Sequence, residues 1–241
     1  LLFAYLHKKI KSSKLIVLDI SIASSLLAIA IMLKFPRLSV SFFWLLEMLV
    51  LFIIGVYYKE TVYRALAGIL GICIFLRLFF IDYFSDKYYR ILGMNLKHNI
   101  IIFIFTSLCF YIIGRLIRGK LIERFLVLDK DISNDEKDIF SFFIVLATIL
   151  LTFLLLKEIK PKWLSLTWAL EGMGILGVGF LLKDRIYRLC ALCVLSLACL
   201  RVVFIDIKGM ETIYKIITFT FLGLILLIIS IIYSKYMTIE K

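Results

Sequence analysis

Proline and charged side chains are scarce in this sequence. Its 241 residues include two prolines, and only 19% are charged, whereas 63% are hydrophobic. The mean hydropathy is +1.05. Soluble domains are about 45–50% apolar. The composition therefore excludes an ordinary soluble domain, and few prolines or charges interrupt the long apolar runs.

Motifs that mark common enzymes and metal sites are also missing. The sequence has no Walker loop, nucleophile elbow or HExxH motif, and no pair of acidic residues in a sizeable loop. Cys190 and Cys193 have CxxC spacing, but no second pair completes the four ligands of a zinc site. We expect no metal and no cofactor. All five cysteines lie in apolar runs and are expected to pack as small apolar residues, namely Cys73, Cys109, Cys190, Cys193 and Cys199.

Eight apolar runs are long enough to cross a membrane as helices, which takes about 18 or more mostly apolar residues. They lack the alternating pattern of membrane β-barrel strands. The runs are roughly 15–33, 38–58, 62–82, 97–114, 139–156, 163–182, 186–206 and 213–234. The predicted fold is an all-α, polytopic transmembrane helix bundle of about eight spans.

The net charge of +12 does not indicate a nucleic-acid-binding protein, because the Lys and Arg residues lie in short clusters between the runs. The side that receives both termini and the 115–138 linker holds 17 of the 29 basic residues, the other side holds 10, and two lie within spans. The positive-inside rule places the richer side in the cytoplasm. We expect a multi-pass protein of the cell (inner) membrane that contacts membrane lipids and binds no nucleic acid.

The three tryptophans support the predicted span boundaries. Trp44, Trp163 and Trp168 lie at the non-cytoplasmic starts of the second and sixth spans. Amphipathic rings gather at this level of the bilayer. We therefore interpret these residues as interfacial anchors.

The chain contains an internal repeat. Residues 44–82 laid over 168–206 without a gap give thirteen identities in thirty-nine positions, including Trp, Glu, Tyr-Arg, Arg and Asp. Each repeat carries four spans, an even number, so the halves enter the membrane in the same orientation and are parallel. We divide the chain into 1–14 (end of a preceding helix and a cytoplasmic basic segment), 15–117 (first repeat), 118–138 (cytoplasmic linker), 139–234 (second repeat) and 235–241 (cytoplasmic tail).

Arginine and glutamate recur inside the spans. Five residues turn an α-helix by about 500°, so Arg77 and Asp82 are expected on different faces. Glu47 instead lies at the same predicted depth as Arg77 on the neighbouring helix. We predict two intramembrane ion pairs, Glu47–Arg77 and Glu171–Arg201. They orient helices on one interpretation; on the other, the arginines bind an anionic group in a cavity.

Charges at the span ends have simpler expectations. Asp82 and Asp206 are predicted to be solvated helix ends, and Arg64 and Arg188 to reach the headgroups by snorkelling. The glycine-rich stretch EGMGILGVG at 171–179 is predicted to allow close helix packing, with a broken, substrate-lining helix as the alternative.

The pattern Trp-x-x-Glu, Gly, Tyr-Arg and Leu-Arg-x-x-Phe-Ile-Asp runs from Trp168 to Asp206. It resembles the bacterial multi-span membrane proteins of the domain-of-unknown-function 2339 family. Tyr214-Lys215-Ile216 and residues 223–233 also look like that family's C-terminal helix, and Trp44 to Asp82 is similar but looser. The resemblance implies a large, many-helix envelope protein whose C-terminal part is this chain. It brings no activity or substrate.

Three function classes remain open at this point. The first, which we favour, is a structural or interaction subunit of the cell envelope, with other membrane subunits or N-terminal repeats of the same chain as partners. The second is a transporter or flippase for an anionic or lipid-linked substrate. The third, an enzyme acting on lipid-linked substrates, has the least support, because no loop carries an acid/base pair.

Overall fold

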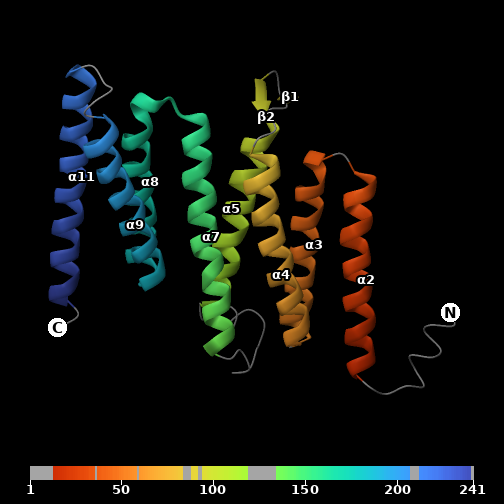
Figure 1. Ribbon diagram of the computed structural model, residues 1–241. Coiled ribbons are helices and arrows are strands. Elements are labelled where there is room, and N and C mark those ends of the chain that lie inside the picture. Colours follow the sequence, from red (N-terminus) through yellow and green to blue (C-terminus); the bar gives the residue numbers. More distant parts are fainter. Residues whose placement is uncertain are drawn as a thin grey trace. The chain divides into compact units, whose positions relative to one another are not determined.

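The fold is seen in a computed structural model that describes residues 13–35, 37–58, 60–83, 88–91, 94–118, 134–206 and 212–239 (Figure 1). Long helices dominate this part of the chain, and each coincides with one predicted apolar run. They are α2 (Ser13–Lys34), α3 (Arg37–Tyr57), α4 (Thr61–Arg77), α5 (His98–Arg118), α7 (Asn134–Glu158), α8 (Pro161–Leu181), α9 (Arg185–Arg201) and α11 (Thr212–Ile239). Two short π-helical segments, η1 (Leu78–Asp82) and η2 (Val202–Asp206), continue α4 and α9.

Among the described residues, five helical segments are long and apolar enough to cross a membrane by length and composition. They are Ser39–Tyr57, Thr61–Asp82, Ser141–Glu158, Pro161–Leu181 and Arg185–Ile205. Their outward side chains are largely apolar, as the half-exposed Val50 and Ile53 on α3 and Leu197 on α9 illustrate. Large exposed apolar surfaces are unusual on soluble monomers. The helices thus have the character expected of a membrane protein.

One element departs from the all-α prediction. Strands β1 (Tyr88–Ile91) and β2 (Met94–Lys97) form an antiparallel hairpin, with Tyr88 opposite Lys97 and Ile91 opposite Met94. The apolar pattern predicts only a connection between spans here, since the runs end at 82 and resume at 97. Tyrosine and isoleucine favour strands, which suits Tyr88, Tyr89 and Ile91 of β1.

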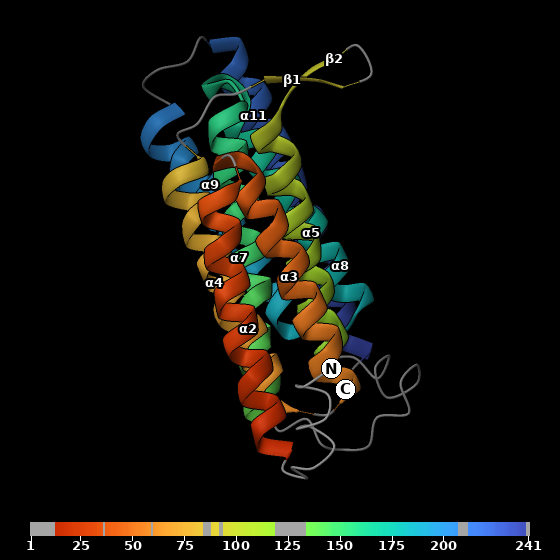
Figure 2. The ribbon, with the colours of Figure 1, turned by 90° about the vertical axis from the view of Figure 1, so that its right-hand side faces the viewer.

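The helices belong to two compact units, which we describe separately. The first holds α2, α3, α4, η1, the hairpin, α5 up to Cys109 and again from Leu116, and α7 up to Phe140. The second holds residues 110–115 of α5, α7 from Ser141, α8, α9, η2 and α11. Within each unit the helices run side by side along roughly one direction (Figures 1 and 2).

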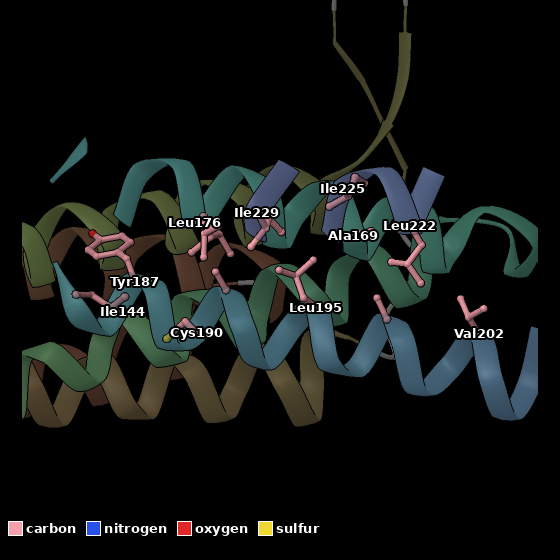
Figure 3. Packing of buried hydrophobic residues seen from close by; sticks show 13 residues of the cluster. Ile144, Ala169, Leu176, Tyr187, Cys190, Leu195, Val202, Leu222, Ile225 and Ile229 are labelled. Carbon is pink, nitrogen blue, oxygen red and sulfur yellow. The ribbon is translucent and has the colours of Figure 1, made fainter. Parts of the chain in front are cut away.

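The core of the second unit lies between α7, α8, α9 and α11. Leu176 on α8 and Leu195 on α9 are buried there with Leu222, Ile225 and Ile229 of α11 (Figure 3). Mutual burial of these apolar side chains holds the four helices in contact.

Glycine allows close packing at two points of α8. A Cβ atom at Gly172 would lie 2.7 Å from Leu195 Cγ, and one at Gly179 would lie 2.9 Å from Arg188 Cγ. Gly174 and Gly177 instead face open space. Because α8 is continuous from Pro161 to Leu181, the structure agrees with close packing and not with a broken helix.

The turn between α8 and α9 is fixed by its own backbone and by one side chain. Lys183 has a positive φ of 53°, and the Asp184 N–H donates to Gly179 O at 3.0 Å, which ends α8. The Asp184 carboxylate accepts a hydrogen bond from the Ile186 N–H at 3.1 Å and caps α9.

Candidate functional site

Polar side chains from α2 and α3 meet inside the first unit. The indole N–H of Trp44 donates to Ala28 O at 2.9 Å, and Ser24 Oγ donates to Glu47 Oε1 at 2.8 Å. Trp44 and Glu47 share one face of α3, since residues three apart on a helix are neighbours. The two hydrogen bonds join α3 to α2.

Arg77 on α4 is enclosed by groups from α3 and η1. Its Nε donates to Ser41 Oγ at 3.0 Å, and Ser41 Oγ in turn donates to Asp82 Oδ2. Arg77 Nε lies 3.9 Å from Asp82 Oδ2, and its guanidinium carbon lies 5.4 Å from the centre of the Trp44 ring. Arg77 is 7% exposed and Asp82 2%. We call Ser24, Ser41, Trp44, Glu47, Arg77 and Asp82 the first polar cluster.

The prediction that Arg77 and Asp82 point in different directions is wrong. It assumed α-helical geometry, whereas η1 is π-helical and the Tyr83 N–H donates to Leu78 O, five residues back, at 2.9 Å. A π turn brings residues five apart to the same side of the helix. Asp82 is consequently buried beside Arg77, and it is not a solvated helix end.

A similar arrangement joins α7, α8 and α9 in the second unit. Thr152 Oγ1 donates to Glu171 Oε1 at 3.0 Å, and the Trp168 indole N–H donates to Thr152 O at 3.3 Å. The guanidinium carbon of Arg201 lies 5.7 Å from the Trp168 ring centre, and Arg201 Nη2 donates to Pro161 O at 3.3 Å. We call Thr152, Trp168, Glu171 and Arg201 the second polar cluster.

Several contacts recur at the 124-residue offset of the sequence repeat. Trp44 donates to the carbonyl of residue 28, and Trp168 to that of residue 152. Each ring carries an arginine over its face, Arg77 and Arg201 respectively. A further recurrence is the close approach of Gly55 to Arg64 and of Gly179 to Arg188.

The two predicted ion pairs are not among the salt bridges of the described residues. Glu47 and Glu171 each accept a hydrogen bond from a hydroxyl group through Oε1. Their Oε2 atoms are buried without a hydrogen-bond partner in the structure. The predicted depths did place glutamate and arginine around the same tryptophan, but Arg77 turns to Ser41 and Asp82.

The other predicted positions have mixed outcomes. Arg64, predicted to reach the headgroups, is 4% exposed and donates from Nη1 to Gly55 O at 3.1 Å, which ties α4 to α3. Arg188 lies 5.7 Å from the Phe180 ring centre. Trp163, at the start of α8, is 42% exposed. The side chain of Asp206 lies outside the part that the structure describes.

A line of hydroxyl groups adjoins the second polar cluster. Tyr111 Oη lies 2.9 Å from Thr148 Oγ1, and the Tyr187 hydroxyl donates to Tyr111 O at 3.1 Å. The two tyrosine rings stack with centroids 5.7 Å apart. Thr152 Oγ1, one turn beyond Thr148, lies 2.9 Å from Thr148 O.

Sequence reasoning missed the serine and threonine partners. A signal existed, because extending the repeat alignment upstream pairs Ser41 with Ser165, and Ser24 with Thr148, at the same offset. Ser41 and Ser165 are both buried. Small hydroxyl residues in apolar helices bond to neighbouring helices, which makes such a pairing informative.

The comparison with known families concerns the C-terminal segment. Residues 138–236 match the family model described as "Predicted membrane protein (DUF2339)". The match confirms the resemblance for the C-terminal part of the chain, from α7 to α11, and it includes the second polar cluster. Together with the apolar helices it indicates a helical membrane protein. Neither a curated protein nor a solved structure matches the chain significantly.

Proposed function

We propose that the chain is a multi-pass protein of the cell membrane with a structural or interaction role in the envelope. It has eight spans in two parallel four-helix repeats, with both termini in the cytoplasm. Its partners are membrane lipids and other membrane subunits or repeats. The matched family is described as a predicted membrane protein, without an activity. The proposed role therefore rests on the contacts in the polar clusters.

The observation that carries the proposal is the enclosure of charge in the first polar cluster. An isolated arginine or aspartate costs about 2.5–3.5 kcal/mol at a span centre on insertion scales, and less toward the end of a span, where Arg77 and Asp82 lie. The ion pair between Arg77 and Asp82, and the hydrogen bonds that both make with Ser41, offset this cost. Arg77 is 7% exposed and contacts both Ser41 on α3 and Asp82 on η1, which supports a role in holding helices together.

The eight-span arrangement is supported by helix length. The hydrocarbon core is about 30 Å thick and requires about 20 helical residues. Beyond the five segments above, α2 has 22 residues, and the shorter apolar stretches Ile100–Leu116 and Lys215–Ile231 lie within α5 of 21 residues and α11 of 28 residues. The recurrence of tryptophan, arginine and glycine contacts at an offset of 124 residues supports the repeat.

The two alternatives would use the same residues differently. A transporter or flippase for an anionic or lipid-linked substrate needs Arg77 or Arg201 to face that substrate. An enzyme acting on lipid-linked substrates needs an accessible acid/base pair. The burial of Ser41, Arg77 and Asp82 against one another favours the structural role over both.

A double-mutant cycle tests the structural role. We expect Arg77→Gln and Asp82→Asn each to lower the free energy of unfolding by about 3 kcal/mol, because each strands the other's charge. The double variant should regain part of that loss, since residues in contact are coupled. The measurement is chemical unfolding of the full chain in one detergent, followed by tryptophan fluorescence.

The control is Lys160→Gln in the exposed turn before α8, which should leave stability unchanged. Additive losses in the double variant would contradict the enclosure argument. A stable Arg77→Gln variant that has lost binding of inorganic phosphate or of anionic lipid shown by the parent chain would favour the transporter.

A further inference from the structure

The hydroxyl group of Thr152 has two acceptors and one proton. Its Oγ1 lies 3.0 Å from Glu171 Oε1 and 2.9 Å from Thr148 O. A hydroxyl group donates one hydrogen bond and accepts others. Thr152 can therefore donate to only one of these oxygens at a time, and the other contact needs a proton from elsewhere.

Glu171 has too few hydrogen-bond donors around it to stabilise an ionised carboxylate. Its Oε1 has the Thr152 contact, whereas its Oε2 is buried without a hydrogen-bond partner in the structure. An ionised carboxylate in an apolar interior is costly unless it is paired and hydrogen-bonded. Burying a neutral carboxylic acid in the same place costs much less free energy than burying a carboxylate.

The charged and titratable neighbours do not replace that missing proton. From α5 the Tyr111 phenol interacts with Glu171, and from α9 the Cys190 thiol interacts with Thr148, one turn before Thr152. Arg201 on α9 directs Nη2 to a backbone carbonyl at the start of α8. Lys215 lies in the first turn of α11. None of the salt bridges among the described residues involves Glu171.

We propose that Glu171 is a proton-binding site within the membrane, occupied as a neutral carboxylic acid. The acid O–H donates to Thr152 Oγ1, and the Thr152 hydroxyl then donates to Thr148 O, so both short contacts are made at once. Intramembrane ionisable groups mark proton and ion pathways in many proteins. The site goes beyond the structural role, and it rests on residues other than the Arg77–Asp82 pair.

The inference is confined to the second unit. In the first unit, the Ser24 hydroxyl donates to Glu47 Oε1 and, among the described residues, to no second acceptor. Glu47 Oε2 is buried without a hydrogen-bond partner in the structure, as Glu171 Oε2 is, but the one proton of Ser24 meets one acceptor, so this contact requires no second donor. The residue at the position of Thr152 in the first repeat is Ala28, which has no hydroxyl group.

Labelling with dicyclohexylcarbodiimide tests the proposal directly. This apolar reagent reacts with a protonated carboxyl group. One C=N π bond of the carbodiimide opens as a carboxyl oxygen bonds to the central carbon and the acid proton passes to the nitrogen, which gives an O-acylisourea. No leaving group or co-reactant is needed. We expect the folded full chain in detergent at pH 7 to carry the adduct at Glu171, located by peptide mass spectrometry. The yield should fall as the pH is raised.

Glu158, at the end of α7, is the control, because it lies at the end of a span, where an apolar reagent is less concentrated than in the membrane interior. A water-soluble carbodiimide at lower pH should reverse this preference. The adduct should be lost in Glu171→Gln. Absence of the adduct from Glu171 in the folded wild-type chain, or a yield no greater than that of Glu158, would overturn the proposal.

The stability of two variants gives a second, independent reading. The amide of Glu171→Gln can donate to Thr152 Oγ1 as the acid does, so its unfolding temperature should match that of the parent chain. Glu171→Leu removes the donor and should unfold at a lower temperature. A Gln variant as unstable as the Leu variant would contradict a neutral acid. The wild-type labelling result decides even if both variants fail to fold.

Discussion

At the scale of single residues, Trp44 and Trp168 perform two roles at once. Each indole N–H is satisfied by a backbone carbonyl on the preceding helix, and each ring face lies beneath an arginine. Buried tryptophan usually finds a partner for its N–H, and its ring face attracts cations. Both residues were predicted as interfacial anchors, but their contacts lie within the protein.

Replacement of Trp44 separates these two roles. Trp44→Phe keeps an aromatic face but leaves Ala28 O without the indole donor, so we expect a loss of about 1 kcal/mol in the free energy of unfolding. Trp44→Ala should lose about 3–5 kcal/mol, because it also leaves a cavity. Trp163→Phe, at an exposed position, is the matched control and should change little. Equal losses for Trp44→Phe and Trp163→Phe would show that the indole bond contributes nothing.

At the scale of elements, the α8–α9 turn shows how two antiparallel helices are joined in three residues. Leu182, Lys183 and Asp184 end one helix and start the next. The positive φ of Lys183 is a conformation that costs an L-residue about 1–2 kcal/mol and suits glycine. The connection between the two helices is short because Lys183 adopts this strained conformation.

Lys183→Gly should therefore stabilise the chain. We expect a gain of about 1 kcal/mol, reduced by the greater freedom of glycine in the unfolded chain. Lys183→Val should have the opposite effect, since a β-branched side chain tolerates a positive φ poorly. The order Gly above Lys above Val in thermal unfolding checks the prediction, and a destabilised Gly variant would refute it.

The elements were largely predictable and their fine geometry was not. Apolar runs of about twenty residues predicted the positions of the helices from α2 to α11, because hydrophobic length alone requires them. The hairpin at 88–97 was missed because it lies in a polar connection without that signal. The π turns were missed because a helix-period calculation assumes one pitch throughout, and this assumption separated Arg77 from Asp82.

The candidate site was predicted in part. Repetition drew attention to the correct glutamates, arginines and tryptophans. It could not assign partners, since Ser24, Ser41 and Thr152 are unremarkable residues whose importance depends on which helix faces which. Contacts between helices are three-dimensional facts that a one-dimensional pattern leaves open.

At the scale of the whole molecule, the proposed orientation depends on the uneven charge of the two sides. The α3–α4 turn and the α7–α8 turn are then on opposite faces of the membrane. Cysteine introduced at Lys160 in a cysteine-free background should react with a membrane-impermeant maleimide applied to intact cells. Cysteine at Glu60 should react only after the cells are opened. The reverse pattern would invert the topology.

The π turns at 78–82 and 202–206 also have a consequence for changes of chain length. A π turn holds one more residue than an α turn, so it behaves as a one-residue insertion absorbed without breaking the helix. Removing one residue between Arg77 and Asp82 would restore an even α-helix in which the two are four residues apart and still neighbours on one face. The same deletion in the α-helical part of α4 would rotate Arg77 by about 100° relative to the turns before it, while the apolar composition of the span would hardly change. In such a helix, the effect of a substitution depends on hydrophobicity. The effect of an insertion or deletion depends on the rotation that it causes and on whether a π turn absorbs it.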